Sequence, residues 1–279
     1  MSPIKLLSTD FDGTLIESSS TEPASVFPIK EKCSEVLALA LTELIEQKSV
    51  WVINTGRTLD LLFKGLEFFD APVAPHYVIT NERHIHRYHE SGDVAALEEW
   101  NRRCDEEHDL LFKTAGKFFE QVHRLVAEYE KKVTFFESAS GIPDELLVTD
   151  EALLDELSAR ILALPGRPKD FAFQRSHIHL HFCHGSYNKG SSLSELGRLL
   201  SIQPKHTLAI GDYHNDIAML TGDVAAMVAC PSNAHPIVKE TVQKAGGHIS
   251  SHPNSRGSAE AIRIYQNLND TLNENFICK

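Results

Sequence analysis

Short apolar runs alternate with segments of helical periodicity at the start of this chain. Residues 4–9, 50–53 and 77–80 are apolar runs of strand length, and polar residues follow each of them. Between these runs, residues 31–47 and 58–69 carry apolar side chains at helical spacing. Strands that alternate with helices predict a parallel sheet with both faces covered, because each helix packs onto the sheet that it crosses. Right-handed crossover connections leave few topologies for such a sheet.

The same alternation resumes after residue 188. The predicted strands are residues 207–211, 224–229 and 248–250, and the predicted helices are residues 189–200, 217–220, 236–245 and 258–268. The chain has 279 residues, of which 42% are hydrophobic, so it can bury one large core or two smaller ones. We therefore predict an α/β fold with a Rossmann-like parallel sheet as its core.

The middle of the chain has a different pattern. Residues 84–88 begin a predicted hairpin, and a long helical zone follows. Two strands predicted within residues 171–183 alternate apolar and polar side chains, which is typical of an antiparallel sheet with one open face. We expect an α+β domain at residues 83–187, inserted into a core that is formed by residues 1–82 and 188–279.

Composition and charge restrict the compartment and the partners. The formal net charge of -12 disfavours a polyanionic partner such as nucleic acid, although a metal ion and basic side chains can reverse the field locally. The five cysteines are scattered without a C-x-x-C pair, which is typical of reduced thiols in a cytoplasmic protein. No signal peptide or membrane-spanning apolar stretch is evident. We expect a cytoplasmic monomer or small homo-oligomer that binds neither nucleic acid nor a membrane.

Asp10 and Asp12 stand where the first predicted strand ends. In open α/β sheets, ligands bind beyond the carboxyl ends of the strands, and an ionised aspartate there is an available nucleophile. Asp12 lies close enough to serve the same substrate, first as an acid and then as a base. Gly13 permits a tight turn, and the Thr14 hydroxyl can tie that turn. The alternative is an ordinary Asp-Gly turn without a function.

A second polar segment, Asn-Thr-Gly-Arg at 54–57, follows the second predicted strand. The Thr55 hydroxyl and the amides around Gly56 can hold phosphate oxygens in the manner of an anion nest. The alternative is a plain loop in which Thr58 caps the next helix. Arg57 either reaches the phosphate or the substrate, or it faces solvent.

Lys189 stands at the start of a predicted helix. This is an unfavourable place for a cation, because the positive charge opposes the helix dipole. A lysine at such a position indicates a role in binding phosphate, for which its compact point charge is suited. The alternative is a solvated lysine on the surface.

Asp212 and Asp216 follow the first strand that is predicted after the middle domain. Magnesium takes oxygen ligands, usually one or two carboxylates together with phosphate and water. Asp10, Asp212 and the backbone carbonyl of Asp12 meet that requirement. Asn215 or Asp216 can cap the next helix. We expect Asp216 to hold the groups that bind the metal rather than to bind the metal itself.

Three histidines alternate with apolar residues in the middle domain. Alternation places His177, His179 and His181 on one face of a strand and their apolar neighbours on the other. The pattern fits a transition-metal site, the polar face of the inserted sheet, or a face that contacts substrate hydroxyls. His84 and His86 have the same spacing and are candidates for the same face.

In combination, these segments resemble the motifs of the haloacid dehalogenase-like hydrolases, which are chiefly phosphatases. The most specific are Asp-Phe-Asp-Gly-Thr-Leu at 10–15 and Gly-Asp-Tyr-His-Asn-Asp at 211–216. The insertion before Lys189 resembles the large cap of the type II members, above all the Cof-type and sucrose-phosphate phosphatase branches. The chain departs from the family pattern at two places where substrate specificity is often set. Asn-Glu-Arg at 81–83 replaces a common Asn-Gly-Ala, and the loop at 18–28 is longer than usual in the family.

The resemblance implies a role for each residue of the core motifs. Asp10 is expected as the nucleophile, and Asp12 as the general acid and base that distinguishes phosphatases from dehalogenases of the family. The residues expected to bind the phosphoryl group are Thr55, Gly56, Lys189 and Asn215. Mg2+ is expected on Asp10, Asp12 and Asp212, with Asp216 in support.

We therefore predict a Mg2+-dependent phosphatase that hydrolyses a small phosphorylated metabolite, a sugar phosphate, through an aspartyl-phosphate intermediate. The cap is expected to close over the site and to select the substrate. Its candidate substrate contacts are Arg175, His177, His179 and His181. Two alternatives are a phosphomutase of the same fold, which returns the phosphoryl group to a sugar, and a catalytically silent sugar-phosphate binding protein. A pure binder has no need of both Asp10 and Asp12, which argues against the last.

Overall fold

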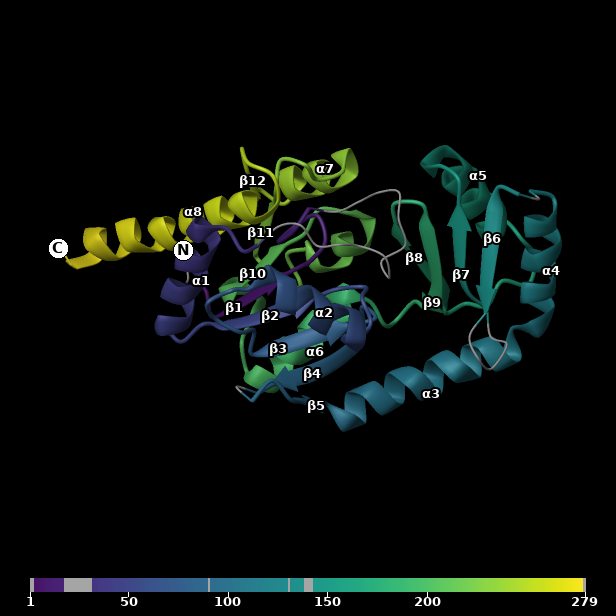
Figure 1. Ribbon diagram of the computed structural model, residues 1–279, viewed down its shortest axis with the longest axis horizontal. Helices are drawn as coiled ribbons and strands as arrows, with labels where there is room; N and C mark the ends of the chain where they lie inside the picture. Colours follow the sequence, from purple (N-terminus) through teal and green to yellow (C-terminus); the bar gives the residue numbers. More distant parts are fainter. Residues whose placement is uncertain (1–2, 18–31, 90, 130, 138–142, 278–279) are drawn as a thin grey trace. The chain divides into compact units, whose positions relative to one another are not determined.

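The computed structural model describes residues 3–17, 32–89, 91–129, 131–137 and 143–277 (Figure 1). The long loop predicted at 18–28 lies outside the described residues. The chain forms two compact units, Met1–Glu98 together with Lys189–Lys279, and Glu99–Asn188. The second unit is thus an insertion in the sequence of the first.

An eight-stranded sheet forms the centre of the first unit, in the order β12-β11-β10-β1-β2-β3-β4-β5. Its parallel strands are β1 (Leu6–Thr9), β2 (Val50–Asn54), β3 (Tyr77–Thr80), β10 (Thr207–Ile210), β11 (Met227–Cys230) and β12 (His248–Ile249). Every residue of β1 and β10 is buried, because both faces of this sheet are covered. The predicted α/β fold with a parallel core is confirmed.

The remaining two strands correct the predicted start of the insertion. β4 (His84–Tyr88) pairs antiparallel with β3, and β5 (Val94–Ala96) pairs antiparallel with β4. The chain reverses between β3 and β4 through Asn81 and Glu82, whose φ angles are 49° and 61°. The hairpin therefore extends the large sheet, and the second unit begins at Glu99 rather than at residue 83. The two histidines of β4 belong to the large sheet and not to the inserted one.

Helices surround the large sheet. They are α1 (Glu35–Glu46), α2 (Leu59–Phe69), α6 (Lys189–Leu200), α7 (Pro236–Lys244) and α8 (Asn254–Ile277), with the 3-10 helices η1 (Pro204–His206) and η2 (His214–Met219). Side chains of α1, α2 and α8 share one apolar core with residues of β1, β2 and β10, and Figure 1 shows α1 and α8 side by side. Helix α6 contacts η2 and the strands β3 and β4. Within the described ranges, every helix falls short of the length or the apolar character that a bilayer-crossing helix needs.

Local hydrogen bonds explain where two of these helices begin. The hydroxyls of Ser34 and Thr58 each accept the backbone N–H three residues further on, at 3.4 Å, so α1 and α2 start directly after these caps. Thr58 is therefore a helix cap, as one alternative predicted. The helix predicted at 217–220 is instead the 3-10 helix η2, and the strand predicted at 224–229 begins only at Met227.

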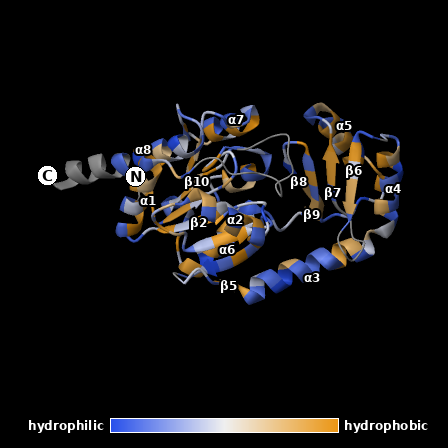
Figure 2. Cartoon of the chain, viewed as in Figure 1, coloured by the Kyte–Doolittle hydropathy of each residue, from blue (hydrophilic) through white to orange (hydrophobic). Residues whose placement is uncertain are grey.

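The second unit combines helices with a small sheet. Its elements are α3 (Glu98–Thr114), α4 (Gly116–Ala127), β6 (Val133–Glu137), β7 (Pro143–Val148), α5 (Glu151–Leu162), β8 (Phe171–Ser176) and β9 (His179–His184). The strands form an antiparallel sheet in the order β6-β7-β9-β8, as the alternating pattern predicted. In Figure 2, β6 and β7 are largely hydrophobic, whereas α3 is hydrophilic over most of its length.

The two faces of this small sheet differ in character. Leu180 and Phe182 point to one face, where they are buried in an apolar core with side chains of α4 and α5. Successive residues of a strand point to opposite faces, so Glu145, His179 and His181 lie on the other face. The helices therefore cover one face, and the second, open face carries Glu145, His179 and His181 beside the apolar Phe136 and Leu147.

Candidate functional site

Polar side chains that follow three neighbouring strands meet at one edge of the large sheet. Asp10 follows β1, Thr55 follows β2, and Asp212 lies two residues beyond the end of β10. Strand β1 lies between β2 and β10 and is parallel to both. The three residues therefore share the carboxyl edge, which is where open α/β sheets bind ligands.

Lys189 is the centre of a buried ion network at this edge. Its side chain has no exposed surface, and its Nζ lies 2.8 Å from Asp10 Oδ1 and 2.7 Å from Asp216 Oδ1. Burial alone would lower the pKa of Lys189, but Asp10, Asp216 and Glu82 raise that pKa above its ordinary value. Lys189 is therefore a buried cation and not a solvated surface residue.

Asp216 is fully engaged with other protein groups. Its Oδ1 accepts a hydrogen bond from Lys189, and its Oδ2 accepts the backbone N–H groups of Asp212 and Tyr213 at 2.8 and 2.9 Å. These contacts cap η2 and fix the loop that carries Asp212. The arrangement suits a residue that supports the site through Lys189 and Asp212.

Thr14 holds the Asp212 carboxylate. The Thr14 hydroxyl donates to Asp212 Oδ1 at 2.9 Å. Burial and the negative charges of Asp10 and Asp216 raise the pKa of Asp212 well above its usual range. Burial and the charge of Asp216 likewise raise the pKa of Asp10 to about 8. The carboxylates repel one another here unless a further cation joins Lys189.

The same carboxylates fit a magnesium ion. One carboxylate oxygen from each of Asp10, Asp212 and Asp216 lies within 4.8 Å of the others. Mg2+ takes oxygen ligands, commonly from one or two carboxylates, and its charge offsets the repulsion between them. Both oxygens of Asp216 already bind protein groups. Asp10 and Asp212 are therefore the carboxylates suited to ligate a metal ion.

Arg57 holds Asp12, the predicted general acid and base. Its Nε and Nη2 donate to the two carboxylate oxygens of Asp12 at 2.7 and 2.6 Å, a fork geometry that matches a carboxylate. The guanidinium carbon lies 5.1 Å from the centre of the Phe11 ring, and Nη1 donates to the Leu61 carbonyl at 3.1 Å. The backbone N–H of Arg57 donates to the Thr55 hydroxyl at 3.2 Å. Arg57 is therefore buried against Asp12 and does not face solvent.

Glu82 is a further carboxylate of this edge that no predicted site contained. Its Oε1 accepts the Asn215 side-chain amide at 2.8 Å, and its backbone carbonyl accepts the Ser192 hydroxyl at 3.1 Å. A Cβ placed on Gly56 would lie 3.3 Å from the same Oε1. Glu82 thus binds the predicted phosphate ligand Asn215, and its backbone N–H donates to the Thr55 carbonyl at 3.0 Å. It lies two residues beyond the end of β3, as Asp212 lies beyond β10, so the strand-end pattern could have identified it.

The four substrate contacts predicted in the second unit do not come together. Arg175 lies on the helix-covered face of the small sheet and forms an ion pair with Asp155 of α5. His177 lies in the turn between β8 and β9 with a φ of 50°, so it leaves the alternation of the strand. Of the four, His179 and His181 share the open face.

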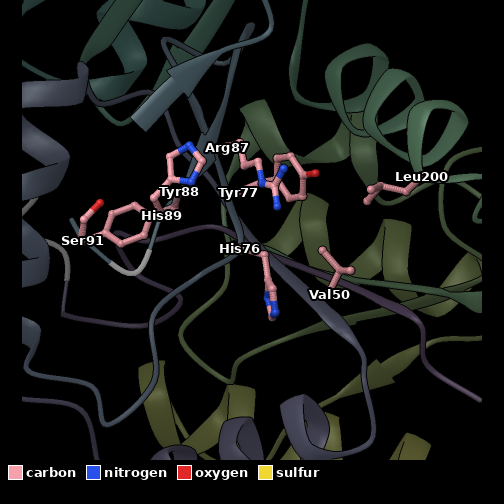
Figure 3. A pocket seen from close by; sticks show the side chains of 8 residues that line it. All are labelled: Val50, His76, Tyr77, Arg87, Tyr88, His89, Ser91 and Leu200. Carbon is pink, nitrogen blue, oxygen red and sulfur yellow. The ribbon is translucent and has the colours of Figure 1, made fainter. Parts of the chain in front are cut away.

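A pocket of about 570 Å³ lies at the opposite edge of the large sheet (Figure 3). Its lining consists of Val50, His76, Tyr77, Arg87, Tyr88, His89, Ser91 and Leu200. Val50 and Tyr77 begin β2 and β3, so the pocket lies at the amino ends of these strands, away from Asp10. None of the described lining residues is acidic, and the pocket offers none of the carboxylate chemistry of the carboxyl edge.

The first unit is an α/β core with aspartates and a lysine at the carboxyl edge of its sheet, and the second unit is an α+β insertion. This class of fold and site has counterparts among known hydrolases. Residues 77–262 match the family of haloacid dehalogenase-like hydrolases. The match spans more than half of the chain, and the chain therefore belongs to this family. The resemblance expected from the motifs is confirmed.

Curated relatives carry phosphatase names. A protein of Streptococcus pyogenes serotype M6, provisionally named a phosphatase, is 24% identical over an alignment of 279 positions that covers 93% of this chain and 97% of the relative. The phosphoglycolate phosphatase of Methanothermobacter thermautotrophicus is 29% identical over 121 residues, 43% of this chain and 52% of that protein. Family and relatives together identify the chain as an enzyme of the phosphatase type.

Solved structures share the fold over both units of the chain. The sucrose-phosphatase of Synechocystis sp., solved in complex with sucrose and phosphate, has a TM-score of 0.64 and 17% identity, covering 95% of this chain and 99% of that chain. A haloacid dehalogenase-like hydrolase from B. subtilis has a TM-score of 0.60 and 16% identity, covering 93% of this chain and 99% of that chain. At these levels of identity the likeness establishes the fold.

Gly13→Ala is expected to damage the carboxyl edge. Gly13 has a φ of +73°, and a Cβ there would lie 2.2 Å from Oδ2 of Asp212. An alanine therefore strains the backbone and displaces a carboxylate that Thr14 already holds. We expect the rate of p-nitrophenyl phosphate hydrolysis to fall about 100-fold, because moving a group of the active site by roughly 1 Å costs about that factor.

Gly222→Ala is the matched control for this substitution. A Cβ on Gly222 meets no described atom within 4 Å, and the residue has no left-handed φ. Its rate should equal that of the wild type, and its unfolding midpoint should change little. Wild-type turnover in Gly13→Ala would show that the carboxylate of Asp212 does not depend on this turn.

Proposed function

We propose that this chain is a Mg2+-dependent phosphatase that hydrolyses a small phosphorylated metabolite, a sugar phosphate, through an aspartyl-phosphate intermediate. The observation that carries the proposal is the buried Lys189, 2.8 Å from Asp10 and 2.7 Å from Asp216 at the carboxyl edge of the sheet. A fixed cation at this place offsets the charge of a phosphoryl group on Asp10. Asp212 adds the carboxylate that a metal ion needs.

The first half of the proposed reaction transfers the phosphoryl group to the protein. A carboxylate oxygen of Asp10 attacks phosphorus in line, and the bond from phosphorus to the leaving oxygen breaks. Asp12 donates a proton to that oxygen, which leaves as an alcohol. Arg57 donates hydrogen bonds of 2.7 and 2.6 Å to the two oxygens of Asp12, which fixes the orientation of that side chain.

The second half of the reaction returns the enzyme to its starting state. Asp12, now a carboxylate, takes a proton from water while the water oxygen attacks the phosphorus of the aspartyl phosphate. The bond between phosphorus and Asp10 breaks, and inorganic phosphate leaves with the oxygen of that water. Asp12 then carries the proton that the next turnover requires.

Binding groups for the phosphoryl oxygens surround the nucleophile in this proposal. They are Thr55, Gly56, Lys189 and Asn215. Asp10, Asp212 and the backbone carbonyl of Asp12 would hold Mg2+. When bound, the ion supplies positive charge that stabilises the phosphoryl oxygens in the transition state.

The inserted unit is the proposed origin of substrate selectivity. A solved relative of the same fold contains sucrose and phosphate, which supports a sugar phosphate as the substrate class. The proposed contacts are Arg175, His177, His179 and His181. His179 and His181 share the open face of the small sheet, whereas Arg175 already pairs with carboxylates of α5.

The proposed setting is the cytoplasm, with a small phosphorylated molecule as the partner. In the described part of the chain the cysteines form no disulfide: Cys33, Cys104, Cys183 and Cys230. Cysteines without disulfides are typical of the reducing cytoplasm.

Removal of divalent metal is expected to silence the enzyme. Loss of the metal charge costs several kcal/mol of transition-state stabilisation, so dialysis against EDTA should lower p-nitrophenyl phosphate hydrolysis by at least about 100-fold. Added Mg2+ should restore the rate. Full activity in protein that elemental analysis shows to be metal-free would contradict the cofactor and leave the role of Asp10 to be tested separately.

A phosphate-release screen over sugar phosphates and other phosphorylated metabolites tests the substrate class. Free phosphate as the product supports a phosphatase. An isomerised sugar phosphate from a hexose 1-phosphate would instead indicate a phosphomutase. Tight binding without turnover of any compound would indicate a silent binding protein.

A further inference from the structure

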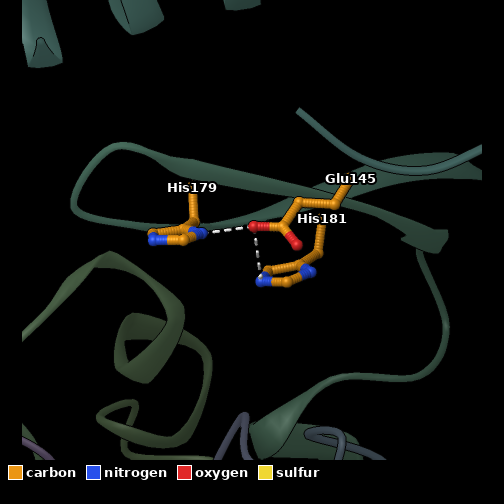
Figure 4. Close-up of side chains that lie close together, drawn as sticks. All are labelled: Glu145, His179 and His181. Atoms are coloured by element: carbon orange, nitrogen blue, oxygen red, sulfur yellow. Dashed lines mark hydrogen bonds and ion pairs between the residues drawn. The ribbon is translucent and has the colours of Figure 1, made fainter. Parts of the chain in front are cut away.

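Two imidazoles and one carboxylate meet on the open face of the small sheet (Figure 4). Glu145 of β7 is directly paired with His181 of β9, and His179 lies two residues away on β9. Nδ1 of His179 is in hydrogen-bond contact with Oε1 of Glu145, and Nε2 of His181 lies 3.8 Å from the same oxygen. The two rings are nearly parallel, at 8°, with centroids 6.2 Å apart. The carboxylate oxygen therefore lies between two ring nitrogens.

We propose that Glu145, His179 and His181 bind a divalent transition-metal ion such as Zn2+, at a site that shares no residue with the carboxylates of the first unit. One donor atom from each side chain lies within 4.8 Å of the others. A tetrahedral ion with bonds of about 2.0–2.2 Å places its donors about 3.4 Å apart, so small side-chain rotations reach the required spacing. Imidazole nitrogens with one carboxylate suit Zn2+, whereas Mg2+ takes oxygen ligands.

The sheet beneath the three donors fixes their positions. Leu146 and Leu180, which are directly paired, are fully buried in the apolar core on the other face. A shift of β7 by one residue would turn Glu145 into that core and expose Leu146. The register is therefore strongly specified, and the donors are held on a rigid element as a metal site requires.

The access of the donors also suits a metal. The side chains of Glu145, His179 and His181 are 18%, 21% and 46% exposed, so an ion can reach them. Three protein ligands leave a further position at the ion for water or another ligand. His123 and Glu137 in the same unit form a pair with a single histidine, in which Nε2 lies 3.4 Å from Oε1 of the glutamate.

Zn2+ binding to the full-length protein tests this proposal. Excess Mg2+ keeps the carboxylates of the first unit occupied while Zn2+ is titrated by calorimetry, and one equivalent is expected to bind. His179→Ala, His181→Ala and Glu145→Gln should each weaken Zn2+ at least about 100-fold, because loss of a ligand exceeds the cost of losing an outer hydrogen-bond partner. The control His123→Ala removes an imidazole from a simple His-Glu pair and should bind Zn2+ as the wild type does.

Nuclear magnetic resonance of the imidazole groups in the wild-type protein gives a second readout that does not depend on variants. Zn2+ should shift the ring signals of His179 and His181 and leave those of His123 in place. Zn2+ that fails to bind, that binds equally well to His179→Ala and His181→Ala, or that leaves both rings unshifted would overturn the proposal. Catalytic activity enters none of these measurements, so their failure is distinct from a failure of the proposed phosphatase reaction.

Discussion

Asp10→Asn is expected to abolish the hydrolysis of p-nitrophenyl phosphate. A carboxamide is not a competent nucleophile, and loss of a catalytic nucleophile lowers kcat by at least about 10⁴-fold. Asparagine has nearly the same volume as aspartate, and its side-chain oxygen can still accept a hydrogen bond from Lys189, which lies 2.8 Å from Asp10 Oδ1. The fold should therefore survive. The rate is measured by release of p-nitrophenolate, and folding by circular dichroism and the unfolding midpoint.

Asp223→Asn is the matched control for the loss of a carboxylate. Asp223 is an exposed residue of the first unit, and the same substitution there should leave the rate and the unfolding midpoint within error of the wild type. Substantial activity in Asp10→Asn would rule out Asp10 as the group that attacks phosphorus. The predicted pattern is a folded and inactive Asp10→Asn protein beside a folded and active Asp223→Asn protein.

Lys189→Met is expected to lower both stability and activity. Methionine matches the length of the lysine stem but leaves the carboxylates of Asp10 and Asp216 facing each other in buried surroundings, with no cation between them. Removal of one partner from a buried ion pair costs about 3–5 kcal/mol. The phosphoryl group also loses a fixed positive charge, so kcat should fall at least about 100-fold. Urea unfolding without divalent metal measures the first effect, and the rate at saturating Mg2+ measures the second.

Lys244→Met controls for the loss of a lysine as such. Lys244 pairs with Glu240 one turn away on α7, and both side chains are exposed. Exposed pairs of this kind contribute little, so the free energy of unfolding and the rate should be unchanged within error. A Lys189→Met protein as stable as the wild type would show that the buried network does not hold the carboxyl edge together.

The carboxyl edge could be predicted from sequence because its residues follow apolar strands. Asp10, Thr55 and Asp212 each come directly after such a run or one glycine beyond it, and parallel strands bring their carboxyl ends to one edge. The unfavourable place of Lys189 at a helix start indicates a role, and its burial between two carboxylates gives the physical reason for that place. Glu82 also follows a strand, but the Asn-Glu-Arg segment at 81–83 departs from the common Asn-Gly-Ala, so the motif comparison gives Glu82 no role.

The sequence pattern does not predict which side chains pair with one another. The contact of Arg57 with Asp12 depends on side-chain rotamers and on the turn that Gly13 allows, and no spacing along the chain encodes it. The sequence pattern places the hairpin of β4 and β5 in the insertion, whereas its strands belong to the large sheet. Its true place follows from the tight reversal at Asn81 and Glu82, where two successive residues adopt a left-handed φ.

Apolar–polar alternation predicts the positions of two of the three histidines and not that of the third. It placed His179 and His181 correctly on one face, but His177 lies in the turn that precedes β9. Glu145, the third member of the cluster, lies 34 positions before His179. Only the register between β7 and β9 brings it beside the histidines, and single-strand periodicity carries no information about register.

Trapping of the phosphorylated enzyme tests the central claim most directly. Wild-type protein is mixed with p-nitrophenyl phosphate and Mg2+, quenched in acid during turnover, digested and examined by mass spectrometry. The account predicts one phosphoryl group on the peptide that contains Asp10, labile to hydroxylamine as an acyl phosphate is, and absent from Asp10→Asn. Sustained turnover with that peptide unmodified, or with the phosphoryl group on another residue, would contradict it.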